Sequence, residues 1–172
     1  MRCSRSLAAA LLFATASMLA AENYRLGFSP GGSSLSVVLA AVASAKSSLL
    51  VACYEFTSPE IAKALEAVHA RGVSVRVVAD YRASKSKASQ VRAMARAGIE
   101  VRLDRRYAIM HDKFMVIDSD GIETGSFNYT KDAIERNAEN ALWEWGVRDK
   151  ASLYRAEWER LWKESGSSTA GR

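Results

Sequence analysis

Residues 107–129 of this 172-residue chain read YAIMHDKFMVIDSDGIETGSFNY. Within them, the apolar run Phe114–Ile117 is typical of a buried strand. The stretch 119–121 is rich in turn residues. We therefore predict two strands, over 109–118 and 122–126, that pair as an antiparallel hairpin.

Four polar residues occur in this hairpin at a spacing of two. His111 and Lys113 precede the turn, and Ser126 and Asn128 follow it. Residues two apart on a strand point to the same face of the sheet. The pattern therefore predicts that an imidazole, an ammonium and two neutral hydrogen-bonding groups converge on one anionic group, which favours phosphate chemistry.

The rest of the chain alternates between strand and helix patterns. Segment 48–54 is an apolar run of strand length, 73–80 is predicted to be a third strand, and 99–103 alternates apolar and polar residues as a fourth; helical spacing of apolar residues separates them. A further strand is expected over 138–147, before an amphipathic C-terminal helix. Crossovers long enough for helices indicate an α/β fold whose sheet is mixed and largely parallel, with helices on both faces.

The N-terminus has a different character from the rest. Arg2 and Arg5 precede an apolar run that ends in small residues at Ala20 and Ala21, the pattern of a secretory signal peptide. The run is shorter than the roughly 20 residues a membrane span needs. We expect residues 1–21 to be removed, leaving an exported, periplasmic or secreted protein without a stable membrane anchor. The expected organisation is one domain over 22–165 and a Gly/Ser-rich, disordered tail over 166–172.

Charge and cysteine content limit the possible functions. The net charge of +5 falls to +3 when the two arginines of residues 1–21 are removed. Such a mildly basic protein does not hold nucleic acid by bulk charge, so any polyanion site must be local. Cys3 leaves with the expected signal peptide, and the remaining Cys53 lies in an apolar run, where a free cysteine is usually part of the core.

The combined pattern resembles a known family. The spacing His111-x-Lys113-x4-Asp118, followed by Gly125-Ser126-x-Asn128, is similar to the HKD motif of the phospholipase D superfamily. With Asn137-Ala-Glu-Asn140, the chain resembles the small, single-motif bacterial endonucleases that resist EDTA. The resemblance covers nearly all of the expected mature chain. It implies a three-layer sandwich and a phosphodiesterase that needs no metal or cofactor.

The resemblance also implies roles for individual residues. His111 is expected to attack phosphorus and form a covalent phosphohistidine, while Lys113 neutralises the phosphoryl oxygens. Asn128 and Ser126 would add hydrogen-bond donors, and Glu139 would hold the second imidazole nitrogen. Asp118 and Gly125 belong to the motif; strand alternation places Asp118 on the face opposite Lys113, so we expect it to support the turn. By the same alternation, Asp112 should lie away from the site.

One histidine cannot both attack phosphorus and protonate the leaving oxygen. The chain offers only one other histidine, His69, which we expect on the surface of a helix. Single-motif members of the family form homodimers with a shared site, so the resemblance implies a homodimer in which His111 faces its symmetry mate. A rival hypothesis is a metal-dependent nuclease that uses Asp112, Asp118 and Asp120 as oxygen ligands.

Basic residues near the motif are candidates for substrate binding. Arg105 and Arg106 directly precede the catalytic stretch, and Lys85 and Lys87 lie in an earlier polar loop. A solvated loop or helix face would explain Lys85 and Lys87 equally simply, whereas Arg105 and Arg106 are nearer the motif in sequence and are the better candidates. The sequence thus predicts a metal-independent endonuclease that cuts DNA, or RNA, without sequence preference. Hydrolysis of phospholipid head groups and non-catalytic nucleic-acid binding stay open as alternatives.

Overall fold

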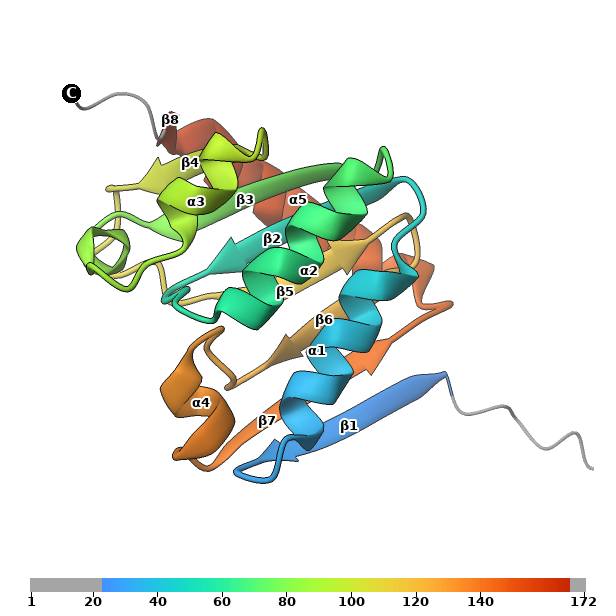
Figure 1. Ribbon diagram of the computed structural model, residues 1–172. Coiled ribbons are helices and arrows are strands. Elements are labelled where there is room, and N and C mark those ends of the chain that lie inside the picture. The colour runs from blue at the N-terminus through green and yellow to red at the C-terminus, as the bar shows by residue number, and fades with distance from the viewer. Residues whose placement is uncertain (1–22, 168–172) are drawn as a thin grey trace, which may run out of the picture.

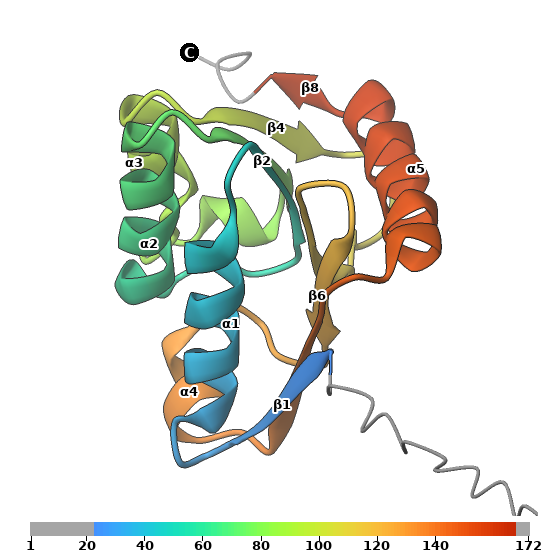
Figure 2. The same cartoon turned by 90° about the vertical axis from the view of Figure 1, so that its right-hand side faces the viewer.

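The computed structural model describes residues 23–167, and these form one mixed sheet with helices on both faces (Figures 1 and 2). The strands follow the order β1-β7-β6-β5-β2-β3-β4-β8. In chain order the elements are β1 (Tyr24–Ser29), α1 (Ser33–Ser44), β2 (Ser48–Cys53), α2 (Pro59–Ala70), β3 (Ser74–Asp80), a 3-10 turn η1 (Ala83–Lys85), α3 (Val91–Arg96), β4 (Glu100–Asp104), β5 (Lys113–Ile117), β6 (Gly121–Gly125), α4 (Lys131–Glu135), β7 (Glu139–Glu144), α5 (Arg148–Glu164) and β8 (Gly166–Ser167).

The mixed α/β class is confirmed, but parallel pairing is confined to the middle of the sheet. β2 pairs with β3, and β3 pairs with β4, in parallel orientation. The other five pairs of neighbouring strands are antiparallel. The sheet is therefore less parallel than expected, because β5, β6, β7, β8 and β1 all run antiparallel to their neighbours, even though α4 and α5 lie in the connections after β6 and β7.

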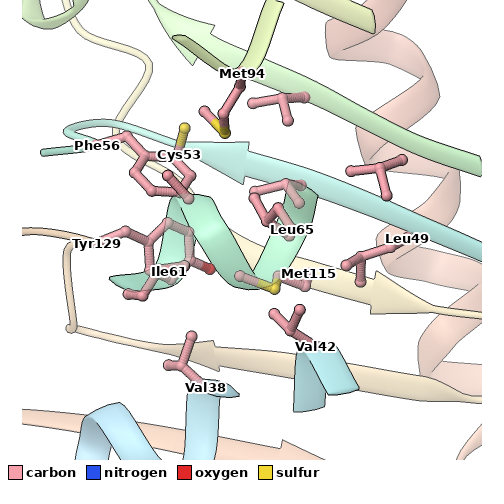
Figure 3. Close-up of a cluster of buried hydrophobic side chains, with 14 of the residues drawn as sticks. Val38, Val42, Leu49, Cys53, Phe56, Ile61, Leu65, Met94, Met115 and Tyr129 are labelled. Carbon is pink, nitrogen blue, oxygen red and sulfur yellow. The ribbon is translucent and has the colours of Figure 1, made fainter. Parts of the chain in front are cut away.

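Strand β2 lies at the centre and separates two hydrophobic cores. Leu49, Val51 and Cys53 point toward α1, α2 and α3, while Leu50 and Ala52 point toward α5. Figure 3 shows part of the first core, with side chains from α1, α2 and β5 packed around β2. In the second core, the buried Trp158 of α5 donates a hydrogen bond from Nε1 to the Val51 carbonyl at 2.9 Å. Because both faces of β2 are covered, its sequence is a continuous apolar run.

The predicted hairpin forms, but its first strand is shorter than expected. β5 begins at Lys113 rather than at residue 109, because Lys113 pairs with Cys53, the last residue of β2. Beyond that point no neighbouring strand remains to pair with. β6 ends at Gly125, so Ser126 also lies outside the ladder.

Two expectations concern the ends of the chain. The tail expected to be disordered from residue 166 begins in ordered structure, because Gly166 and Ser167 form β8 against β4. The expected signal peptide, residues 1–21, and the rest of the tail, 168–172, lie outside the described residues. Within residues 23–167, no helix has both the length and the apolar character that crossing a membrane requires.

Candidate active site

The motif residues gather at one edge of the sheet. Lys113 begins β5, Ser126 directly follows β6, and Glu139 begins β7. These three strands are adjacent and antiparallel, so the start of β5, the end of β6 and the start of β7 lie at the same edge. The carboxyl end of β2 meets the same edge through the pairing of Cys53 with Lys113. Open α/β sheets commonly bind ligands at the carboxyl ends of their parallel strands.

His111 lies in the segment before β5 and not on the strand, which corrects the expectation that strand alternation aligns it with Lys113. Its exposed ring instead packs on Tyr54, with ring centroids 4.8 Å apart and planes tilted by 58°. The preceding residue, Met110, is buried, and its backbone N–H donates to Asp80 Oδ2 at 3.0 Å. Asp80 at the end of β3 thus fixes the segment that presents His111 to solvent.

Lys113 is surrounded by carboxylates at the edge of the site. Its Nζ donates to the His111 carbonyl at 2.7 Å and lies 5.8 Å from the centre of the Tyr54 ring. Burial lowers the pKa of Lys113, while the charges of Asp112, Glu139 and Glu55 act in the opposite direction. The Lys113 ammonium is therefore held next to the backbone of His111, where it could also bind an anion.

Ser126 and Glu139 form a hydrogen-bonded cluster. Ser126 Oγ donates to Glu139 Oε2 at 2.6 Å and accepts from the Asn140 backbone N–H at 3.1 Å. Asn137 Nδ2 donates to the other carboxylate oxygen, Oε1, at 3.2 Å. None of the hydrogen bonds made within residues 23–167 joins Glu139 to His111. The expected carboxylate–imidazole contact is therefore absent among the described residues, where the His111 ring packs on Tyr54 instead.

Gly125 permits this cluster to form. A Cβ built at this position would lie 2.1 Å from the Asn140 carbonyl oxygen, a distance that no real side chain tolerates. Only glycine therefore lets β7 approach β6 closely enough for Ser126 to reach Glu139.

The side chain of Asn128 is not committed to a partner. Its Oδ1 is buried and has no hydrogen-bond partner in the described part of the protein. Leaving a buried polar atom unpaired costs roughly 1–3 kcal/mol. Such orphan groups call for a reason, and a ligand at this edge of the sheet would supply one.

A hollow of about 380 Å³ opens beside the motif, between the β5–β6 pair and α5. His111, Asp112 and Lys113 line one side, and α5 contributes Tyr154 and Glu157 on the other. Asp112 therefore does not lie away from the site as expected. Burial raises its pKa, and the charge of Glu157 adds to this effect.

Asp118 lies at the opposite end of β5, where its carboxylate accepts hydrogen bonds from backbone N–H groups. Its Oδ1 accepts from the backbone N–H groups of Ser47 and Ser48 at 2.8 and 2.9 Å, and its Oδ2 accepts from Lys46 N–H at 3.0 Å. Burial alone would raise its pKa, but these hydrogen bonds lower it overall. Asp118 thus ties the β5–β6 turn to the connection between α1 and β2.

The metal hypothesis required Asp112, Asp118 and Asp120 to converge. Asp112 precedes β5 and the other two follow it, which separates Asp112 from Asp118 by roughly 20 Å along an extended strand. Among residues 23–167, no three His, Cys, Asp or Glu side chains group in a way that could hold a metal ion. The three aspartates therefore do not form one site.

The basic candidates divide into two groups. The Arg105 guanidinium lies 3.7 Å from the centre of the Tyr81 ring, and Lys85 Nζ lies 4.4 Å from the same centre. Arg106 instead forms an ion pair with Glu164, at 3.7 Å. Lys87 is exposed in the loop after η1. Arg105 and Lys85 thus form a cationic cluster on Tyr81, whereas Arg106 is partly neutralised.

Two residues of the site were missed in the sequence. Tyr54 packs against His111, and the charge of Glu55 acts on Lys113. Both directly follow β2, whose carboxyl end adjoins Lys113. Polar and aromatic residues immediately after a fully apolar strand were the signal that could have pointed to them.

Comparisons with known proteins give a consistent result. Residues 38–162 match the family described as cardiolipin synthase, PLD-like domain. The chain is 39% identical over 136 residues to the mitochondrial cardiolipin hydrolase of Canis lupus familiaris, and 38% identical over 143 residues to that of Homo sapiens. These matches cover 78% and 83% of this chain, but only 52% and 56% of the relatives. Phospholipase D of Rickettsia bellii is 33% identical over 126 residues, or 73% of this chain and 63% of that protein.

Solved structures also match. Nuc from Salmonella typhimurium, a phospholipase D family member, superposes with a TM-score of 0.82 at 39% identity, and the match covers 84% of this chain and 96% of that one. NucT from Helicobacter pylori superposes with a TM-score of 0.74 at 22% identity, covering 84% and 99%, which supports the fold alone.

Proposed function

The chain belongs to the phospholipase D superfamily, and from this we propose that it is a phosphodiesterase that cleaves nucleic acid without a metal ion. The observation that supports this best is the arrangement at the sheet edge. An exposed imidazole and an ammonium line one hollow, at His111 and Lys113, and the uncommitted amide of Asn128 follows β6 at the same end of the sheet. These groups suit a phosphodiester better than a neutral substrate.

The proposed reaction has two displacements. A neutral His111 nitrogen attacks phosphorus, the P–N bond forms, and the bond to the leaving alcohol oxygen breaks. Lys113 stabilises the negative charge that develops on the non-bridging oxygens. A second acid donates a proton to the leaving oxygen. Water activated by the same group then attacks phosphorus, breaks the P–N bond and releases a phosphate monoester.

We propose that the second acid is the His111 of another copy of the chain. The other histidine, His69, lies near the end of α2, where Nδ1 is 3.4 Å from the Val73 carbonyl oxygen, and it does not line the hollow. A homodimer with a two-fold axis beside His111 would bring two imidazoles to one phosphate.

An apolar surface beside the hollow supports this dimer. Phe114, Thr124, Leu142 and Leu26 are successive partners across β5, β6, β7 and β1, so their side chains share the face that α5 covers only in part. β1 lies away from α5 (Figure 2), and Leu26 is 48% exposed. On α5 itself, Leu153 lines the hollow and is 73% exposed. We term the residues Thr124, Leu142, Leu26 and Leu153 the apolar face; Phe114, which is 3% exposed, belongs to the core.

Two substrate classes compete for this chemistry. The cations Arg105 and Lys85 on Tyr81 lie in the connections that follow β4 and β3, and they favour a polyanion such as DNA or RNA. The names of the curated relatives, cardiolipin hydrolase and phospholipase D, favour a phospholipid instead. Phospholipid hydrolysis is therefore the second candidate.

A substrate panel in excess EDTA separates the candidates. The protein is incubated with plasmid DNA, with RNA, and with vesicles of cardiolipin or phosphatidylcholine. We expect nicking and degradation of nucleic acid, at a rate unchanged by EDTA. Release of phosphatidic acid or head group with intact plasmid would favour the lipid candidate. Tight binding of DNA without cleavage of any substrate would favour the non-catalytic alternative.

We also propose that the protein is exported. The basic and apolar character of residues 1–21 supports this. Fractionation of cells, with the intact mass of the recovered protein, is expected to show a periplasmic or secreted chain that begins close to residue 22. A full-length chain in the cytoplasm would contradict the proposal.

A further inference from the structure

A carboxyl group lies fully buried in β6, the strand that precedes the loop 125–129 with Ser126 and Asn128. Glu123, in the middle of β6, is 1% exposed, and its neighbours across the sheet are Met115 and Trp143. Its Oε2 accepts a hydrogen bond from the Tyr129 hydroxyl at 2.8 Å. Burial raises the pKa of Glu123 to about 8, so the group is largely a neutral acid at pH 7. Burying such a group is costly, and a purely apolar residue would fill the same space without that cost.

Tyr129 connects this acid to the loop that carries the motif. It directly follows Asn128 and is 1% exposed. Its carbonyl oxygen accepts from the backbone N–H groups of Thr57 and Ser58, both at 2.9 Å. Its ring packs on Phe56 with centroids 5.5 Å apart, inside the core that Figure 3 shows. The end of the loop is thus joined to the segment that follows β2.

The loop is held at both ends, and Ser126 near its beginning is also held by its hydrogen bonds to Glu139 and Asn140. At its beginning, the Phe127 backbone N–H donates to the Asn140 carbonyl oxygen of β7 at 3.2 Å. At its end, Tyr129 is held from below by Glu123 and from the side by Thr57 and Ser58.

Asn128, between the two anchors, depends on them for its direction. Its buried Oδ1 has no partner among residues 23–167, and Thr130 N–H bonds only its backbone oxygen, at 2.7 Å. The direction of its amide therefore follows from the backbone of the loop. Because Asn128 directly precedes Tyr129, a change in the backbone at Tyr129 would change the position of Asn128.

We propose that Glu123 and Tyr129 form a buried positioning pair that holds the loop 125–129, and with it Ser126 and Asn128, in the shape required for phosphodiester cleavage. The inference rests on the proposed function of the site. Neither residue touches the substrate. The directional hydrogen bond sets the depth of the Tyr129 ring in the core, which apolar contact alone would leave less defined.

Three variants test the pair with bis(4-nitrophenyl) phosphate as the substrate. Tyr129→Phe removes one oxygen atom and is expected to lower kcat about tenfold while KM changes less than about twofold. Glu123→Gln keeps an oxygen that accepts from Tyr129 and is expected to retain kcat within about threefold. Ile122→Val lies on the opposite face of β6, packs in the α5 core, and is expected to lower stability while leaving kcat unchanged.

A double variant, Glu123→Leu with Tyr129→Phe, decides between a positioning and a merely structural role. It replaces the polar pair with apolar groups of similar shape, so it is expected to fold even if Tyr129→Phe alone does not. We expect it to be as stable as the wild type or more so, yet about tenfold slower in kcat. A stable double variant with wild-type kcat would overturn the proposal.

Hydrogen exchange separates this proposal from the proposed function. Backbone amides of residues 125–129 are expected to exchange faster in the double variant than in the wild type, whether or not the protein turns over the substrate. Wild-type protein without turnover, but with this difference in exchange, would reject the proposed function and keep the positioning pair. Equal exchange in both proteins would reject the pair.

Discussion

At the scale of single residues, the candidate site depends on side chains whose neighbours differ from those that strand spacing suggests. His111 packs on Tyr54, and Glu139 bonds Ser126 and Asn137. Within the described residues, the imidazole is thus positioned by a ring contact and by its backbone. A carboxylate could reach its second nitrogen only after a change in the ring orientation or from another copy of the chain.

The buried acid Glu123 predicts a specific dependence of stability on pH. Its pKa rises from an ordinary value of 4.5 to about 8 in the folded protein, so the folded state binds the proton more tightly than the unfolded state. Its contribution to the free energy of unfolding is therefore greatest below pH 4.5 and is lost as pH rises toward 8. Glu123→Gln lacks this titration. We expect the melting temperature of the wild type to fall more than that of Glu123→Gln between pH 5 and pH 8.

Both proteins keep His69, His111 and all other titrating groups, so the difference between their curves isolates Glu123. Parallel curves of melting temperature against pH would mean that Glu123 titrates normally, and thus that it is not buried as a neutral acid.

At the scale of elements, the close approach of β6 and β7 forms the Ser126–Glu139 cluster. Gly125→Ala places a Cβ against the Asn140 carbonyl, and this overpacking is expected to lower the free energy of unfolding by about 1–3 kcal/mol. Gly166→Ala is the matched control, because a Cβ at that position meets no atom within 4 Å. Thermal unfolding of the two variants makes the comparison; equal stability would show that β6 and β7 are not tightly apposed at Gly125.

Much of this level could be predicted from the sequence. Segment 48–54 is apolar on both faces and indeed forms a central strand, since burial on both faces leaves a continuous apolar run, and segment 73–80 forms the strand next to it. Helices α2 and α5 followed from helical spacing in the same way. These patterns lie within the segment that forms the element, so they can be recognised without knowing its partners in the fold.

Other features could not be predicted because they depend on pairing across the sheet. The start of β5 is set by the last residue of β2, Cys53, which lies 60 positions earlier in the chain. The alternation of residues around 109–117 does not indicate that the strand begins at Lys113. The prediction that His111 and Asp112 lie on the strand was wrong for this reason. The contact between Glu123 and Tyr129 could not be predicted either, because the burial of Glu123 depends on the helices that cover that face of the sheet.

At the scale of the whole molecule, we propose that two copies of the chain form one complete site. We expect a homodimer in solution, and a specific activity that falls on dilution as monomers form. Leu153→Glu places a charge on the apolar face and is expected to shift the protein toward monomer and to lower activity in parallel. Lys163→Glu, at an exposed position elsewhere on α5, serves as the control. Mass in solution, by light scattering, is measured beside the activity; a fully active monomer would exclude the shared site.

The most direct test of the central claim is plasmid cleavage in excess EDTA by the wild-type protein and by His111→Asn. Asparagine removes the attacking nitrogen while keeping a polar side chain, so DNA binding should persist. The account predicts that the wild type cuts at full rate without metal and that His111→Asn is slower by about 10³-fold or more. Cleavage that appears only after Mg²⁺ is added, or a His111→Asn variant that cuts as fast as the wild type, would contradict it.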